Sequence, residues 1–257
     1  TDAHTKEVLR YREALKFGFD ALKNRPLTTN LFVDMVRIIK QQDIGVRRTV
    51  GTALKDAAGE VVYTPPVGEA LLRDKLTNLE QFIHADDGLD PLVKMAVQHY
   101  QFEAIHPFDD GNGRTGRILN LLYLVQAGLL DIPVLFLSRY IMANKAAYYA
   151  GLRAVTEQQA WEPWLLYMLR GVTSTAQQTF EQVTRIRGLM EEVRARVQRD
   201  APGIYSKDLI EVIFRHPYTK IQFLVDAGLA KRQTASAYLQ TLAGLGVLSP
   251  RKMGREM

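Results

Sequence analysis

Residues 106–117 read His-Pro-Phe-Asp-Asp-Gly-Asn-Gly-Arg-Thr-Gly-Arg. An unperturbed imidazole has a pKa of about 6.5, so His106 can accept a proton at neutral pH. Asp110 offers hard oxygens of the kind that Mg²⁺ prefers, and that ion usually binds through one or two carboxylates together with the phosphates of a substrate. A hydrophobic core needs none of these groups. The stretch therefore predicts a site for phosphate chemistry.

The same stretch supplies groups that bind anions. Gly111 and Gly113 allow consecutive backbone N–H groups to turn inward as an anion nest, with Asn112 between them tolerant of a left-handed backbone conformation. Arg114 and Arg117 are three residues apart, so on a helix they share one face and can form paired hydrogen bonds with phosphate oxygens. The stretch thus combines a base, a metal-binding carboxylate, a phosphate cradle and two cations.

Helices are expected on both sides of this stretch. Apolar residues recur at helical spacing over residues 91–105, and Asp90-Pro91 provides an N-cap and a first-turn proline. Residues 118–125 are apolar nearly all round, which is typical of a buried helix, and Gly128 ends it. The first helix would therefore place His106 at the start of the stretch, and the positive N-terminal end of the second helix would face the anion that the stretch binds. The chain has no G-x-x-x-x-G-K-(S/T) stretch, so the sequence excludes a P-loop.

Most of the remaining chain also has helical periodicity, which indicates an all-α fold. Further helices are expected over residues 8–22, 31–39, 71–83, 138–157 and 162–198. The exception is a predicted β-hairpin with strands at residues 49–54 and 60–63, which ends before Pro65-Pro66. The longest helical segment, 162–198, is compatible with a link between domains or with packing across a homodimer.

The C-terminal residues 200–257 form a second predicted unit. Asp200-Ala-Pro-Gly is a break, and short helices are expected over residues 206–214, 219–226 and 231–242. The arrangement is similar to a winged helix-turn-helix, with residues 245–256 as the wing and a recognition helix that starts with Lys231, Arg232, Gln233, Thr234 and Ser236. Residues 200–257 as a whole contain eight Lys and Arg against five Asp and Glu, a net charge of +3. That charge is weak for a DNA-binding face, so DNA binding and protein docking or regulation both stay open.

Composition limits the class of protein. The chain has 257 residues, 47% of them hydrophobic, which is enough for one large domain and a small one. It has no cysteine, which rules out disulfides and thiolate metal sites. No run of 18 apolar residues or signal peptide is present, so we expect a cytoplasmic protein without membrane contact. The net charge of +5 permits an acidic partner without identifying one.

Residues 106–117 resemble the signature of the Fic (Fido-fold) family, H-x-F-x-(D/E)-G-N-G-R-x-x-R, at all eight specified positions. The resemblance extends over about residues 8–171. It implies a helical Fic/Fido core with a small β-hairpin flap, followed here by a small winged-helix domain. The expected organisation is an N-terminal helix (1–26), the Fido domain (27–172), a connecting helix (173–199) and the winged-helix-like domain (200–257).

The resemblance also implies an activity. Fic proteins mostly transfer AMP from ATP to a Ser, Thr or Tyr hydroxyl of a target protein, with Mg²⁺ bound. By position, His106 would be the general base, Phe108 a core anchor and Asp110 the Mg²⁺ ligand. The nucleotide phosphates would contact Gly111, Asn112, Gly113, Arg114 at the β-phosphate and Arg117 at the γ-phosphate.

Two further parts of the expected site come from the resemblance. The hairpin corresponds to the family's flap, which pairs with the target segment by strand addition, although a purely structural hairpin is an alternative. Its residues nearest to nucleotide and target would be Val61, Val62, Tyr63 and Thr64. Asn144 and Tyr148 correspond to part of the adenine pocket, although aromatic residues at such spacing are more often in the core.

Other functions stay open from the sequence. One alternative is a DNA-binding regulator in which the Fic-like domain only senses nucleotide. The intact His106 favours an enzyme, because a nucleotide sensor does not need a base beside the phosphate loop. Within the enzyme class, transfer of UMP or a phosphoryl group, or removal of AMP, is an alternative. Many Fic proteins carry an inhibitory helix with the pattern (S/T)-x-x-x-E-(G/N), and we find no convincing copy of it here. The glutamate of that helix pairs with the second arginine of the signature, here Arg117. Because the chain starts at Thr1 and stops within the expected wing, we expect that it is a fragment of a longer protein, and that no such glutamate opposes Arg117 in the fragment.

Overall fold

A computed structural model describes residues 2–49, 52–55, 59 and 61–251. The chain divides into two compact units, unit 1 (Thr1–Thr179) and unit 2 (Phe180–Met257). Each unit has its own hydrophobic core. The two units are therefore described separately.

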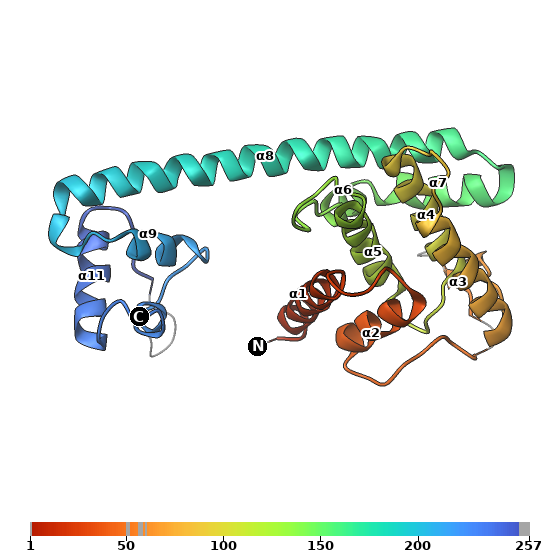
Figure 1. Ribbon diagram of the computed structural model, residues 1–257, viewed down its shortest axis with the longest axis horizontal. Coiled ribbons are helices and arrows are strands. Elements are labelled where there is room, and N and C mark those ends of the chain that lie inside the picture. The colour runs from red at the N-terminus through yellow and green to blue at the C-terminus, as the bar shows by residue number, and fades with distance from the viewer. Residues whose placement is uncertain (1, 50–51, 56–58, 60, 252–257) are drawn as a thin grey trace. The chain divides into compact units, whose positions relative to one another are not determined.

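Unit 1 is helical apart from one short hairpin (Figure 1). The predicted helices are confirmed, with boundaries that differ by a few residues. The expected helix over residues 138–157 is interrupted at Asn144, whose backbone (φ −120°, ψ 37°) is not helical. The helices of unit 1 are α1 (Ala3–Ala21), α2 (Thr29–Lys40), α3 (Glu69–His84), α4 (Pro91–Ile105), α5 (Asn112–Gln126), α6 (Ser138–Ala143), α7 (Lys145–Gln158) and the first part of α8 (Trp161–Asp200).

Helix α5 occupies the centre of unit 1, where it packs against α1, α2 and α4. Its residues 118–124 are all buried, as their nearly continuous apolar sequence predicts. Trp164 of α8 is also fully buried, and its Nε1 donates to the backbone oxygen of Ala96 in α4 at 2.9 Å. Both α4 and α5 are therefore anchored in the core, and the loop that joins them starts and ends at fixed positions.

Side-chain caps set several helix starts. The carboxylate of Asp90 accepts hydrogen bonds from the N–H groups of Leu92 and Val93, and Pro91 occupies the first turn of α4, as predicted. Thr28 caps α2 in the same way through Leu31. At the C-terminal end of α5, Gly128 adopts the left-handed conformation (φ 73°) that the sequence led us to expect there.

The predicted hairpin is present as a two-stranded antiparallel ladder of β1 (Leu54–Lys55) and β2 (Val61–Tyr63). Its first strand starts at Leu54, later than the predicted start at residue 49; residues 50–51 lie outside the described part. Leu54 pairs with Tyr63, and Lys55 pairs with Val61. The Tyr63 hydroxyl donates to the backbone oxygen of Ala104 at 2.7 Å. This bond fixes the base of the hairpin beside the C-terminal end of α4.

Unit 2 contains the three short helices that the sequence predicts. They are α9 (Lys207–Phe214), α10 (Ile221–Asp226) and α11 (Arg232–Gly244), preceded by the short 3-10 helix η1 (Pro202–Ile204). A separate core joins them to the last turns of α8 through Val193 and Val197. The winged part is not confirmed, because residues 245–251 contain no strand and residues 252–257 lie outside the described part. Among the described helices, none is both long and apolar enough to span a bilayer.

Candidate active site

The loop between α4 and α5 begins at His106, which ends α4 in the left-handed backbone conformation (φ 49°, ψ 59°). Its N–H still donates to the backbone oxygen of Phe102 at 3.0 Å. A positive φ is uncommon for residues other than glycine, although histidine adopts it more often than most. This conformation turns the chain sharply out of α4 and into the loop.

Asn112 holds the loop in shape. Its Oδ1 accepts from the N–H of Phe108 at 2.8 Å, and its Nδ2 donates to the backbone oxygen of Phe108 at 2.7 Å. Asn112 is only 2% exposed, and the Phe108 ring is fully buried. The amide of Asn112 therefore braces the loop, and any contact of Asn112 with an anion is left to its backbone N–H.

The anion nest differs in detail from the expected one. Gly111, and not Asn112, has the left-handed conformation (φ 90°, ψ 2°), and α5 already begins at Asn112 instead of near residue 118. A Cβ on Gly111 would lie 2.9 Å from Cγ2 of Val36, so close packing and backbone conformation both require glycine. The first N–H groups of a helix have no intrahelical acceptor. Residues 112–114 thus present the positive end of α5 to the pocket.

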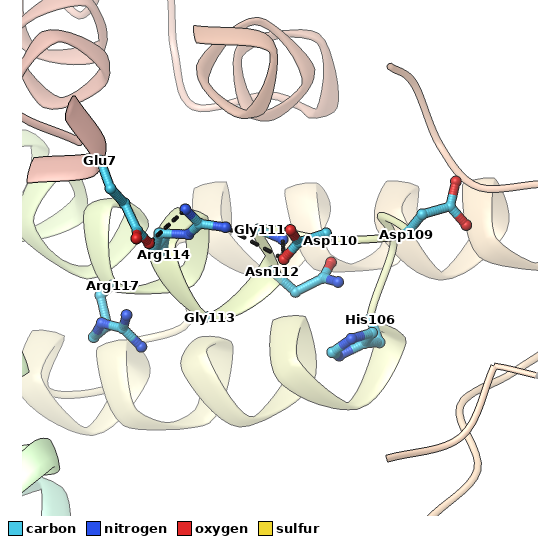
Figure 2. A pocket seen from close by; sticks show the side chains of 9 residues that line it. All are labelled: Glu7, His106, Asp109, Asp110, Gly111, Asn112, Gly113, Arg114 and Arg117. Carbon is cyan, nitrogen blue, oxygen red and sulfur yellow. Dashed lines mark hydrogen bonds and ion pairs between the residues drawn. The ribbon is translucent and has the colours of Figure 1, made fainter. Parts of the chain in front are cut away.

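A polar pocket of about 330 Å³ opens over this loop. Figure 2 shows Gly111 to Gly113 between Arg117 and His106 in that view. The pocket brings together the predicted base, carboxylate, glycine loop and both arginines. Its lining residues are Glu7, His106, Asp109, Asp110, Gly111, Asn112, Gly113, Arg114 and Arg117.

Charged side chains are paired at one end of the pocket. Nη1 of Arg114 lies 2.7 Å from Oε1 of Glu7 in α1, and its Nη2 lies 3.3 Å from Oδ1 of Asp110 (Figure 2). Lys40 of α2 forms an ion pair with the other oxygen of Asp110. The ion pairs hold Arg114 and Asp110 in place before any ligand binds.

The electrostatics of His106 suit a base. Burial lowers the pKa of its imidazole below the ordinary value. The side chain is therefore neutral at pH 7, with a ring nitrogen able to accept a proton. A base on the pocket wall beside a phosphate-binding loop can deprotonate a hydroxyl that approaches the bound phosphate.

Asp110 has the properties of a carboxylate that shares a metal with phosphates. Partial burial acts to raise its pKa, but hydrogen bonds from Lys40 and from the N–H of Gly111 lower it below the ordinary value overall. The carboxylate is thus ionised at neutral pH, and its side chain is 59% exposed. Among the described residues there is no group of three or more His, Asp or Glu that could hold a metal by themselves. Asp110 is thus a single exposed carboxylate on the pocket wall, which could serve as one ligand of a cation.

Other predicted site residues do not line this pocket. In the hairpin, Val61 is exposed, Tyr63 bonds to Ala104, and neither they nor Thr64 belong to the pocket lining; of Val62 only the strand backbone is described. Asn144 lies between α6 and α7, where its Nδ2 donates to the backbone oxygen of Tyr140. Tyr148 is buried in the core, with its hydroxyl 3.0 Å from Nε2 of His99. Their roles stay predictions.

Arg47 is a site residue that the sequence did not predict. It is 1% exposed, its Nε donates to the backbone oxygen of His106 at 2.8 Å, and its Nη2 donates to that of Pro66 at 2.6 Å. The N–H of Arg47 also donates to the backbone oxygen of Pro107 at 2.9 Å. Arg47 therefore connects the start of the loop between α4 and α5 to the segment after the hairpin. It lies in a loop without periodicity, so no sequence pattern marks it.

Two family descriptions match the chain. The Fic/DOC family matches residues 26–124, which include the whole loop and pocket except Glu7. The C-terminal domain of SoFic-like protein adenylyltransferases matches residues 189–257. Both matches agree with the division into a helical core and a separate C-terminal unit.

Relatives cover parts of the chain. Protein adenylyltransferase fic-1 of Caenorhabditis briggsae is 30% identical over 117 residues, which are 41% of this chain and 22% of that protein. A probable protein adenylyltransferase of Aquifex aeolicus (strain VF5) is 38% identical over 85 residues, which are 33% of this chain and 26% of that protein. The chain thus spans roughly a quarter of the length of these relatives.

A solved structure has a similar fold. The Fic family protein from Desulfovibrio desulfuricans G20 superposes with a TM-score of 0.58 at 17% identity, over 93% of this chain and 69% of that chain. At that identity the likeness concerns the fold alone. Together with the matched signature residues, it agrees with the sequence comparison. Residues 26–124 thus match a Fic/DOC family domain, and residues 189–257 match the C-terminal domain of SoFic-like protein adenylyltransferases.

Proposed function

We propose that this protein is a protein adenylyltransferase, which transfers AMP from ATP to a Ser, Thr or Tyr hydroxyl of a target protein. One observation carries the proposal. A neutral imidazole, His106, shares a pocket with the glycine loop, the N-terminal end of α5 and two arginines. The adenylyltransferases that match parts of this chain support the same choice.

The reaction places each group in a defined role. The target hydroxyl oxygen attacks the α-phosphorus of ATP, and His106 takes its proton. The bond from that phosphorus to the oxygen bridging the α- and β-phosphates breaks, and pyrophosphate leaves. Backbone N–H groups of residues 112–114 stabilise the charge on the phosphates, Arg114 holds the β-phosphate and Arg117 the γ-phosphate.

Mg²⁺ is the cation that fits this role for Asp110. The ion would bind the Asp110 carboxylate together with phosphate oxygens, and when bound it would neutralise charge on the leaving pyrophosphate. Lys40 and Arg114 pair with the same carboxylate in the free protein. Binding of the ion would release at least one of these pairs, so that Arg114 can turn towards a phosphate.

The hairpin suits the binding of the target segment. Strand β2 is at the edge of a two-stranded ladder, and it is fixed beside the end of α4 by the bond from Tyr63 to Ala104. An extended target segment would add to this edge and present its hydroxyl to the pocket near His106. Val61, Val62, Tyr63 and Thr64 are the residues we expect at that contact, and Asn144 and Tyr148 stay candidates for the adenine end.

Intact mass spectrometry tests the proposal directly. The protein is incubated with ATP and Mg²⁺, alone and with lysate proteins, and an adduct with the mass of AMP is expected. His106→Ala should reduce the rate of adduct formation by about 10²–10⁴-fold, because the phosphate cradle stays but the base is gone. ATP binding by this variant should be nearly unchanged.

His216→Ala is the matched control, because it removes an exposed histidine of unit 2. It should react like the wild type. The assigned donor would be wrong if ATP gave no adduct with the mass of AMP, while another nucleotide gave an adduct with the mass of UMP or of a phosphoryl group. Near wild-type adduct formation by His106→Ala would refute the role of the base.

A further inference from the structure

A carboxyl group that the proposed reaction does not use lies beneath the catalytic loop. Glu103 is in the last turn of α4, three residues before His106, and it points towards α5. The residue keeps some exposed surface, but its Oε1 atom is buried and has no hydrogen-bond partner within the described part of the chain. A buried polar atom without a partner is costly, so its presence calls for a reason.

The side chain of Arg117 lies near that of Glu103 beneath the glycine loop. A Cβ built on Gly113 would lie 3.1 Å from Nη1 of Arg117 and 3.9 Å from Oε1 of Glu103, so both side chains reach the same point beneath the glycine loop. A Cβ on Gly116 would lie 2.8 Å from Oε1 of Glu103, so a larger residue at position 116 would displace the carboxyl. The two glycines thus make space for this pair.

Arg117 forms no ion pair with this carboxyl in the described part of the chain. Its Nε is buried and without a hydrogen-bond partner, and no ion pair within 4.0 Å joins it to any acid among the described residues. Arg114, in contrast, is paired with Glu7 and Asp110. Of the two pocket arginines, only Arg117 has an unpaired charge beside an acid that is not bonded to it.

Burial raises the pKa of Glu103 to about 7, and the nearby charge of Arg117 acts in the opposite direction. The acid is therefore mostly neutral below pH 7 and mostly ionised above it. Both charge states are accessible at physiological pH. Only the ionised state attracts the guanidinium as a full charge.

We propose that Glu103 is a positioning residue for Arg117. As a neutral acid, Glu103 leaves the guanidinium available to a phosphate in the pocket; as a carboxylate, it draws the guanidinium into an internal ion pair away from the ligand. The inference rests on the proposed function, because it takes the ligand to be ATP. ATP binding then favours the protonated acid, so affinity falls as the pH rises through the range in which Glu103 ionises.

Other ionisable groups around this pair keep one charge state between pH 7 and pH 8.5. Burial lowers the pKa of His99 in α4 to about 3, so its imidazole is neutral. Burial raises the pKa of Tyr148 in α7 well above its ordinary value, and it also raises that of Tyr11 in α1. Because burial lowers the pKa of His106, this side chain is neutral as well. In this range, Glu103 is the group near Arg117 that changes charge.

Calorimetric titration with ATP and Mg²⁺ at pH 6 and pH 8 tests the inference. At pH 8 the neutral fraction of Glu103 is about 0.1, so the wild type should bind ATP about ten-fold more weakly than Glu103→Gln, whereas the two proteins should differ little at pH 6. The glutamine is neutral and nearly isosteric, so it mimics the protonated acid. Comparison of the two proteins at each pH cancels the ionisation of ATP itself.

Asp109→Asn is the control, since it removes an exposed carboxyl from the same pocket. It should keep the wild-type ratio of affinities between the two pH values. Glu103→Met offers a second neutral side chain if the glutamine variant does not fold. Proton uptake gives a further readout: at pH 7.5, titrations in two buffers of different ionisation enthalpy should show that the wild type takes up more protons on binding ATP than Glu103→Gln does.

The outcomes separate this inference from the proposed function. If the wild type and Glu103→Gln bind ATP with the same dependence on pH, the positioning role is wrong while the proposed function stands. If neither protein binds ATP at pH 6, the proposed function fails and this inference fails with it. If Glu103→Gln binds ATP about ten-fold more tightly than the wild type at pH 8, and equally at pH 6, both the inference and the proposed function are supported.

Discussion

His106 illustrates how single residues of this site are held. Its backbone has a positive φ, its carbonyl oxygen accepts a hydrogen bond from the buried Arg47, and its imidazole is partly buried. Each constraint acts on a different part of the residue: the backbone angle sets the turn, the arginine fixes the carbonyl, and burial sets the charge. A base with a fixed position and a neutral ring is ready to accept a proton without rearrangement.

The lowered pKa of His106 predicts the acid limb of the pH profile. His106 must be neutral to act as a base, so kcat/KM should fall as the pH drops through the pKa of His106 in the free protein. Because burial lowers that pKa, we expect the midpoint below the value of about 6.5 of a free histidine. The measurement is kcat/KM for adduct formation between pH 5 and pH 8. A midpoint clearly above 6.5 would contradict the assignment of the base.

The sequence predicted the residues of this loop better than the residues around it. The motif placed His106, Asp110 and the two arginines in one pocket because all of them lie within twelve residues, so local geometry keeps them close. Arg47 and Lys40 reach the loop from segments far away in the chain. Only the packing of α2 and of the following loop against α5 brings them there, and no periodicity records such contacts.

At the scale of elements, close approach between helices positions the loop. Gly18 of α1 is the narrowest point: a Cβ there would lie 2.6 Å from Cδ1 of Leu122 in α5 and 2.9 Å from Sδ of Met35 in α2. Three helices therefore meet where only a hydrogen atom fits. The same helix α1 carries Glu7, which pairs with Arg114. The spacing of α1 and α5 thus also sets the position of one wall of the pocket.

Gly18→Ala and Gly188→Ala form a matched pair for this contact. Alanine is a better helix former than glycine by about 1 kcal/mol, so Gly188→Ala in α8, where a Cβ meets nothing within 4 Å, should increase stability by up to that amount. Gly18→Ala should instead destabilise by roughly 1–3 kcal/mol, because the methyl group overpacks the core. Chemical denaturation of both variants measures the free energy of unfolding. An unchanged or higher stability of Gly18→Ala would show that α1 can shift without cost.

Periodicity predicted the helices because each buries one apolar face, but it could not locate every boundary. Residues 112–117 are polar and glycine-rich, yet α5 begins at Asn112, because the loop braced by Asn112 and the left-handed Gly111 start the helix there. The break at Asn144 has no proline or glycine to mark it. The wing, which was expected from the order of helices alone, is not confirmed. Local pattern thus specifies the elements, whereas tertiary contacts determine where some of them start.

At the scale of the molecule, the chain carries two hydrophobic cores. The core of unit 1 includes Trp164 and Met168 from the start of α8, and the core of unit 2 includes Val193 and Val197 from its end. Helix α8 thus contributes to both units. Every residue that lines the pocket lies between residues 7 and 117, within unit 1. We therefore expect the proposed binding of nucleotide to depend on unit 1 and not on the packing of unit 2.

A chain that ends at Thr179 should bind ATP with an affinity within about two-fold of that of the full chain, since distant and independent sites contribute additively to within a few tenths of a kcal/mol. The truncation keeps the whole core of unit 1 and all lining residues of the pocket. Calorimetric titration measures the affinity, and circular dichroism verifies that the helices of unit 1 are folded. Arg114→Ala, which removes one phosphate-binding cation, should weaken ATP binding equally in the short and the full chain. A folded short chain that no longer binds ATP would mean that unit 2 supports the pocket, and the C-terminal unit would then be part of the enzyme and not an independent module.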